Sequence, residues 1–128
     1  MKTITLLLVL IISVQLNAQI AEIPFELKNG LILLDVTIND NTEASTFVFD
    51  TGATSDLLDS TTASKLGLKA NYKQDVSGAG GAKSYDIILD QKLTLQNKIE
   101  IDSTHLVLTD LTKLKDALER KFDGIIGY

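Results

Sequence analysis

Short β-rich runs that end at turn-forming residues recur along this chain, and this rhythm constrains its fold more than any other feature. The first two runs, residues 23–28 and 31–38, flank Asn29-Gly30. That dipeptide best tolerates the two positive φ angles of a type I′ hairpin turn. Residues 44–49 form a third run after a polar turn at residues 39–41. We therefore expect an antiparallel meander of three strands at the start of the domain.

A second hairpin is expected in the later part of the chain. Residues 89–95 and 98–102 alternate apolar and polar side chains on either side of Gln96-Asn97. This alternation is typical of strands with one buried face. Residues 105–108 are apolar apart from His105 and predict a further strand.

Two short helices interrupt the predicted strands. Asp59 is placed to cap a helix of about two turns, and Gly67 is placed to take the left-handed conformation after its last turn. A second helix is expected after Asp110, because apolar residues then recur at helical spacing. These residues are Leu111, Leu114, Leu118 and Phe122. The sequence therefore predicts an all-β fold class, mainly β with two short helices.

The first 18 residues have the pattern of a secretory signal peptide. Lys2 gives a positive start, residues 4–12 are apolar except for Thr5, and the small residue Ala18 precedes Gln19. About 11 apolar residues fall short of the roughly 20 that a spanning helix needs. We expect cleavage after residue 18, a single domain over residues 19–128, and export to the periplasm or outside the cell without a stable membrane anchor.

Composition excludes several classes of function. The 128 residues are enough for one domain, and 17 acidic against 12 basic side chains give a net charge of -5, which disfavours nucleic acid as a partner. The chain has no cysteine and a single histidine, His105, so thiolate nucleophiles, cysteine zinc sites and histidine pairs are excluded. We interpret His105 as a structural or surface side chain.

The strongest chemical signal is the octet Phe47-Val48-Phe49-Asp50-Thr51-Gly52-Ala53-Thr54. An apolar strand that ends in Asp50 desolvates this carboxylate on one side. The following Thr51 and Gly52 favour a tight turn with a hydroxyl and backbone amides nearby. Asp50 is therefore a candidate for proton chemistry, and an ordinary turn after a buried strand is the alternative.

Ser77-Gly78-Ala79-Gly80-Gly81 is the second signal. Its small residues favour either a hairpin tip that closes over an extended ligand or a plain surface loop. A phosphate-binding loop is rejected, because Ala82 and Lys83 stand where such loops need glycine.

Together with Phe122-Asp123-Gly124-Ile125-Ile126-Gly127, these two motifs resemble the aspartic proteases. The octet resembles their catalytic signature, the glycine-rich segment their flap hairpin, and the last motif their second hydrophobic-hydrophobic-Gly element. The order is that of the family, and the short single domain resembles its retropepsin-like branch. The resemblance covers about residues 22–128 and implies an acid-protease barrel of one lobe.

The resemblance also implies roles for individual residues. It implies an aspartic endopeptidase that activates water between two carboxylates and acts on an extended peptide or protein, with no metal and no cofactor. The catalytic residue would be Asp50, with Thr51, Gly52 and Ala53 supporting its turn, Gly78, Ala79, Gly80 and Gly81 forming the flap, and Ile125, Ile126 and Gly127 forming the scaffold beside the site.

Only one Asp-Thr-Gly is present, so the second carboxylate must come from elsewhere. A homodimer with one Asp50 per chain is one source. A second lobe beyond Tyr128 is the other, because the family continues into a helix and a strand that we expect to be missing after Gly127. A catalytically silent peptide-binding or interaction domain of the same fold is the alternative function.

Overall fold

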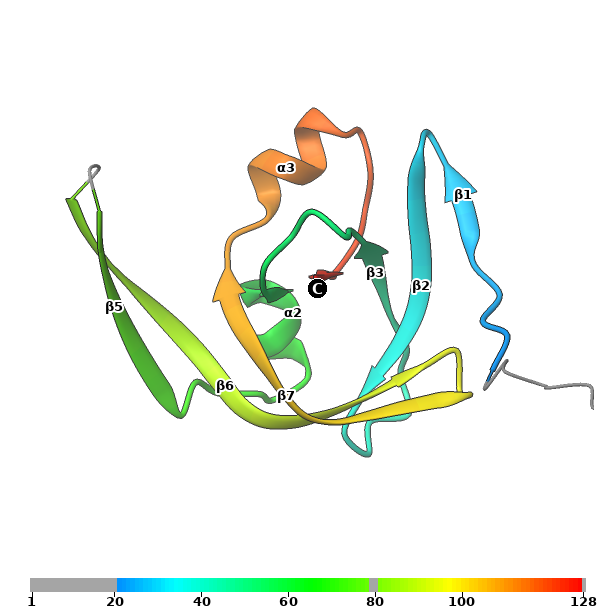
Figure 1. Ribbon diagram of the computed structural model, residues 1–128, viewed down its shortest axis with the longest axis horizontal. Helices are drawn as coiled ribbons and strands as arrows, with labels where there is room; N and C mark the ends of the chain where they lie inside the picture. Colours follow the sequence, from blue (N-terminus) through cyan, green and yellow to red (C-terminus); the bar gives the residue numbers. More distant parts are fainter. Residues whose placement is uncertain (1–20, 79–80, 128) are drawn as a thin grey trace, which may run out of the picture.

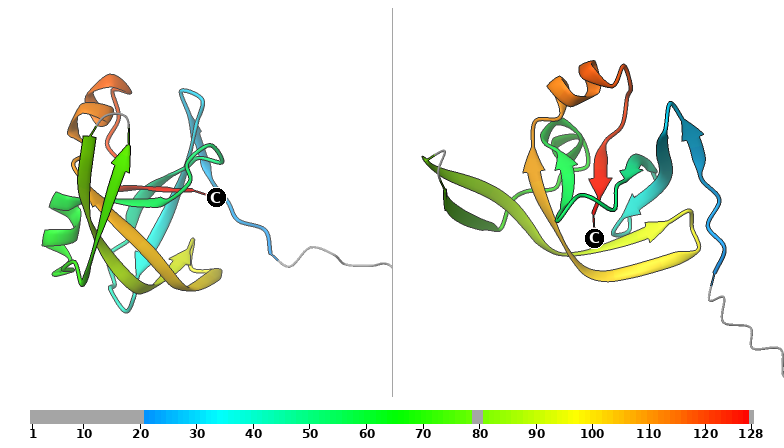
Figure 2. Two further views of the ribbon diagram at one scale, coloured as in Figure 1. Left: turned by 60° about the vertical axis from the view of Figure 1, so that its left-hand side comes forward. Right: turned by 45° about the horizontal axis from the view of Figure 1, so that its top comes forward.

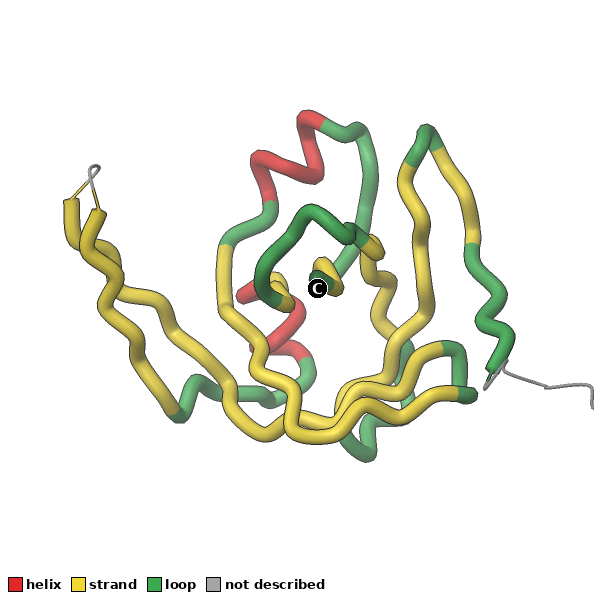
Figure 3. The backbone as a smooth tube through the Cα atoms, in the orientation of Figure 1, coloured by secondary structure: helices red, strands yellow, loops and turns green. Residues whose placement is uncertain are grey.

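The computed structural model describes residues 21–78 and 81–127, so the predicted signal peptide lies outside the described residues. Strands dominate the fold, and two short helices accompany them (Figures 1 and 3). The strands are β1 (Glu26–Lys28), β2 (Leu31–Ile38), β3 (Ser45–Phe49), β4 (Asp56–Asp59), β5 (Tyr72–Gly78), β6 (Gly81–Leu95), β7 (Ile99–Thr109) and β8 (Gly124–Ile126). The helices are α2 (Ser60–Lys65) and α3 (Thr112–Ala117).

The strands form one eight-stranded sheet in the order β1-β2-β3-β8-β4-β7-β6-β5. β2 also pairs with β6, so the sheet curls back on itself, although it is not a clear barrel (Figure 2). The predicted fold class, mainly β with two short helices, is confirmed. The sheet places β8 between β3 and β4, which are the strands on either side of the Asp50 turn.

The predicted opening meander is confirmed. β1 pairs with β2 and β2 with β3, all antiparallel. Asn29 and Gly30 have φ values of +50° and +79°, as a type I′ turn requires. β1 is shorter than expected and begins at Glu26.

The later strands are longer than predicted. The hairpin at Gln96 and Asn97, with φ values of +49° and +54°, joins β6 to β7. The strand expected at residues 105–108 is the second half of β7. Ser103, at φ +56°, interrupts the alternation of side chains within β7, which explains why the sequence pattern indicated two strands.

Helix α2 ends as predicted but begins differently. The Gly67 amide donates to the Ser64 carbonyl at 3.2 Å and the Leu68 amide to the Ala63 carbonyl at 2.9 Å, which is a Schellman motif. Asp59 stands at the N-cap position without capping the helix. Its carboxylate instead accepts from the Leu111 amide at 3.1 Å, because Asp59 is also the buried last residue of β4.

Helix α3 is shorter than the predicted helix over residues 111–122. Asp110 Oδ1 accepts from the Thr112 amide at 2.9 Å and so stabilises its first turn. The helix ends at Ala117, and Glu119 has a positive φ of +51°. Phe122 is buried beyond the helix, in the segment that leads into β8.

The apolar side chains form two cores. The larger lies within the curled sheet and includes Phe47, Leu58, Leu106 and Ile126. The smaller consists of Leu33, Val48, Leu111, Phe122 and Ile125, and Ala53 and Leu57 pack against it. The segment after Asp50 therefore packs against the smaller core through Ala53 and Leu57. Among the described residues, no helix is long and apolar enough to cross a membrane.

Candidate active site

Asp50 follows the last residue of β3 and opens a tight turn. Its amide donates to the Ile126 carbonyl at 2.9 Å, and its carbonyl accepts from the Ala53 amide at 3.1 Å. Its carboxylate Oδ1 accepts from the Gly52 amide at 2.8 Å. The residue as a whole is exposed in the single chain. The carboxylate is thus oriented by one backbone amide and open to solvent.

The other residues of the turn differ in their surroundings. Thr51 is exposed, whereas Ala53 is partly buried against the smaller core. A Cβ on Gly52 would lie 3.2 Å from Asp50 Oδ1, which is a tight contact. Glycine at this position therefore lets the backbone amide approach the carboxylate.

The three residues of the predicted scaffold lie directly behind this turn. Ile125 and Ile126 belong to β8, which runs parallel to β3 and antiparallel to β4. Gly127 follows, and a Cβ there would lie 2.7 Å from the Ala53 carbonyl oxygen and 2.8 Å from that of Ser55. Only glycine fits so closely against the backbone of the loop.

Asp56, which sequence analysis did not single out, closes the loop at its far end. Its Oδ1 accepts from the Gly127 amide at 2.8 Å. Burial raises the pKa of the Asp56 carboxyl, and the hydrogen bond from Gly127 only partly offsets this effect. Its sequence signal was weak, because the four-residue strand β4 does not alternate apolar and polar residues.

The β5–β6 hairpin extends away from the body of the domain beside this loop (Figure 1). Its register places Tyr72, Gln74 and Val76 on the same face as Ile87, Tyr85 and Lys83. Tyr72 is 50%, Val76 45% and Tyr85 37% exposed, so most of this face is apolar and uncovered, and Lys83 lies at its outer end. The opposite face is polar and carries the ion pair between Lys73 and Asp86, with N and O 3.4 Å apart.

Two of the predicted flap residues, Gly78 and Gly81, lie at the described end of this hairpin. Gly78 pairs with Gly81, which has a φ of +99°. Ala79 and Gly80 lie outside the described residues.

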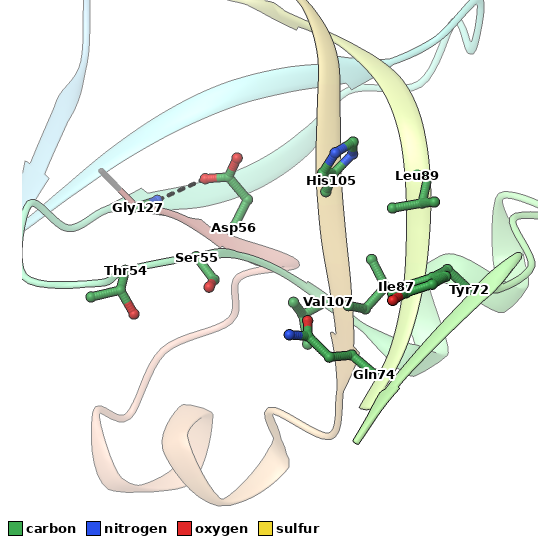
Figure 4. A pocket seen from close by; sticks show the side chains of 10 residues that line it. All are labelled: Thr54, Ser55, Asp56, Tyr72, Gln74, Ile87, Leu89, His105, Val107 and Gly127. Carbon is green, nitrogen blue, oxygen red and sulfur yellow. Dashed lines mark hydrogen bonds between the residues drawn. The ribbon is translucent and has the colours of Figure 1, made fainter. Parts of the chain in front are cut away.

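Two adjoining pockets, of about 560 and 520 Å³, separate the loop from the apolar face of the hairpin. They share walls from both sides and together form a groove that begins at Gly52. Figure 4 shows Thr54, Ser55 and Asp56 on one side of the first pocket and Tyr72 and Gln74 on the other. The shared lining consists of Thr54, Ser55, Gln74, Ile87 and Val107. A groove with an apolar floor and one strand wall suits an extended chain.

His105 is exposed on β7 and lines the first pocket. Its Nδ1 accepts a long hydrogen bond from the Asp90 amide, at 3.4 Å. Over residues 21–78 and 81–127, no group of three or more His, Asp or Glu side chains is placed to hold a metal ion.

Comparisons with known proteins agree with this architecture. The sequence model of a family described as aspartyl protease matches residues 34–128. No curated protein matches the chain. A retropepsin-like aspartic protease from Rickettsia conorii has a similar structure, with a TM-score of 0.52 at 15% sequence identity. The similarity covers 81% of this chain and 70% of that one, and it bears on the fold.

Proposed function

Because this chain belongs to the aspartyl protease family, we propose that it is an endopeptidase in which Asp50 is the catalytic carboxylate. The observation that carries this proposal is the position of Asp50. It lies beside Gly52, where the groove begins, and the Gly52 amide binds one carboxylate oxygen. The groove has apolar side chains on its floor and polar side chains on its loop wall, a lining that can take an extended peptide.

Peptide hydrolysis at this site needs a second carboxylate. Two carboxylates a few ångströms apart share one proton, which is the established behaviour of aspartic protease pairs. The ionised carboxylate takes a proton from water as this water attacks the peptide carbonyl. The protonated one donates to the carbonyl oxygen, and a proton then passes to the leaving nitrogen. Thr51 and Gly52 would hold the carboxylate in position.

We assign the second carboxylate to Asp50 of a second copy of the chain. An apolar row crosses β1, β2 and β3 next to Asp50, because Leu27 pairs with Ile32 and Ile32 with Phe49. Leu27 is 65% and Phe49 39% exposed. A second copy packed on this row would bury it and bring its own Asp50 to the site.

We further propose that residues 1–18 direct export, so that the domain acts in the periplasm or outside the cell. An extended peptide would lie along the apolar face of the β5–β6 hairpin. Such a peptide would cover Tyr72, Val76 and Tyr85, which are exposed without it.

The first test replaces Asp50. Asp50→Asn keeps an oxygen that accepts from Gly52 but cannot take a proton, so peptide cleavage should fall at least about 10³-fold. The substrate is a pool of extended peptides of mixed sequence, with products read by mass spectrometry. Asp35→Asn, an exposed change on β2, is the matched control. Equal cleavage by both variants would rule out Asp50 as the catalytic carboxylate.

A mixing experiment tests the second copy. When parent and Asp50→Asn chains are unfolded together and refolded in equal amounts, a site built from two chains leaves about one quarter of the sites intact, whereas independent sites leave about one half. Activity near one half would reject the shared site. Peptide binding by the parent without cleavage would favour the silent binding domain instead.

A further inference from the structure

Two consecutive residues hold both ends of the loop that carries Asp50. The Ile126 carbonyl accepts from the Asp50 amide at 2.9 Å, where β3 ends. The Gly127 amide donates to the Asp56 carboxylate at 2.8 Å, where β4 begins. A shift at either end of the loop from Asp50 to Asp56 would therefore strain a hydrogen bond to Ile126 or to Gly127.

Asp56 accepts a hydrogen bond from the Gly127 amide, which is not part of the strand pairing of the sheet. β8 ends at Ile126, and Gly127 lies beyond its last paired residue. Gly127 is also pressed against the loop, since a Cβ there would lie 3.0 Å or less from three backbone atoms of Ala53 and Ser55. A side-chain acceptor is the group that can reach this amide, and Asp56 supplies it (Figure 4).

We propose that Asp56 is a positioning residue for Asp50, which acts by binding the Gly127 amide and so fixing the loop against the end of β8. This inference rests on the proposed function of Asp50. Asp56 lines the first pocket and acts through the backbone, so it is not assigned a role in proton transfer.

The proposal predicts that the hydrogen bond of Asp56 to the Gly127 amide matters and that its negative charge does not. Asparagine at position 56 keeps a carbonyl oxygen for the Gly127 amide, whereas alanine leaves this partly buried amide without its acceptor. A residue that only positions the loop should be replaceable by asparagine. Loss of the hydrogen bond in Asp56→Ala should lower kcat more than it raises KM, because the Asp50 carboxylate moves while the hairpin wall of the groove keeps its position.

The experiment compares kcat and KM for the parent, Asp56→Asn and Asp56→Ala on one peptide cleaved by the parent. We expect Asp56→Ala to lower kcat about tenfold or more and to change KM less than about threefold, and Asp56→Asn to stay within about threefold of the parent. Asp116→Ala removes an exposed carboxylate on α3 and serves as the control. Equal losses in the asparagine and alanine variants would overturn the proposal, as would an alanine variant with the kcat of the parent.

Amide hydrogen exchange provides a readout that does not depend on cleavage. The Asp50 amide should lose protection in Asp56→Ala and keep it in Asp56→Asn. If the parent cleaves nothing but exchange follows this pattern, the proposed function fails while the positioning contact stands. Unchanged Asp50 protection in Asp56→Ala overturns the inference. If alanine prevents folding, the asparagine variant decides alone, because it must keep both kcat and protection.

Discussion

Replacing Gly127 by alanine measures how tightly the end of β8 fits the Asp50 loop. The new Cβ would lie 2.7 Å and 2.8 Å from the carbonyl oxygens of Ala53 and Ser55, and 3.0 Å from the Ser55 nitrogen. Ordinary contacts begin at 3.4 Å, so the loop must move by about 0.4–0.7 Å to clear the three atoms. All three neighbours are backbone atoms, which no side-chain rotation can clear. Such overpacking costs about 1–3 kcal/mol of the free energy of unfolding.

The same displacement should reduce catalysis. A misplacement of about 1 Å lowers rates about 10²-fold, so about half that distance predicts a loss near tenfold. A domain stable by about 5–15 kcal/mol stays folded after this change, so the loss would come from geometry. Urea unfolding measures the stability, and peptide cleavage at 25 °C measures kcat.

Gly67→Ala provides the control for this prediction. Gly67 has a φ of +70° with no atom near its missing Cβ, so alanine strains the end of helix α2 by about 1–2 kcal/mol, and Gly67 lines neither pocket of the groove. This variant should lose stability but keep the kcat of the parent. Equal kcat in the Gly127 and Gly67 variants, or a Gly127 variant as stable as the parent, would refute the reasoning.

Two further predictions concern the support behind the site. Gly124→Ala places a methyl group against the buried ring of Phe47 and the Leu57 carbonyl, so urea unfolding should show a loss of about 3 kcal/mol or more, part of which Phe47→Leu restores. Burial alone would raise the pKa of Asp59, but the Leu111 amide and Lys115 lower it. The Asp59 carboxylate therefore stabilises the fold above its ordinary pKa, and this stabilisation is lost as the pH falls through the pKa that Asp59 has in the folded state. Lys115→Met should therefore cost about 3 kcal/mol at pH 7 and progressively less below about pH 4 in thermal unfolding, and a penalty independent of pH would contradict this assignment.

Local signals in the sequence were sufficient for much of the fold. The turn at Asn29-Gly30 and the helix end at Gly67 depend on the φ angles of one or two residues, and the structure shows these angles as expected. The motif containing Asp50 likewise predicts the tight turn that follows β3, where the Asp50 carbonyl accepts from the Ala53 amide. Each of these features is decided within a few neighbouring residues, which is why the sequence pattern is informative there.

The remaining features depend on contacts between distant segments. β4 has only four residues without alternation, and its strand conformation comes from pairing with β7 and β8. Asp59 is a residue type that favours helix caps, but its carboxylate binds the Leu111 amide and Lys115, which belong to the segment around α3. The role inferred for Asp56 has the same origin, because its partner Gly127 lies 71 positions later in the chain. No short pattern in the sequence contains these pairs.

The two sides of the Asp50 turn differ in a way that bears on its chemistry. On one side β8 binds the Asp50 amide, and Gly127 fills the space behind the loop without room for a methyl group. On the other side the carboxylate is exposed next to Phe49, an aromatic side chain that a single chain leaves 39% uncovered. A carboxyl group whose backbone is held by β8 and whose oxygens are open to solvent can meet a second carboxyl group that approaches from the solvent side. The closed side therefore sets the direction of the Asp50 carboxylate, and the open side is where a second copy would supply the other carboxylate under the proposed function. The mixing experiment tests whether a second chain completes the site, because a site built from two chains loses activity with the square of the fraction of parent chains, whereas an independent site loses it in proportion to that fraction.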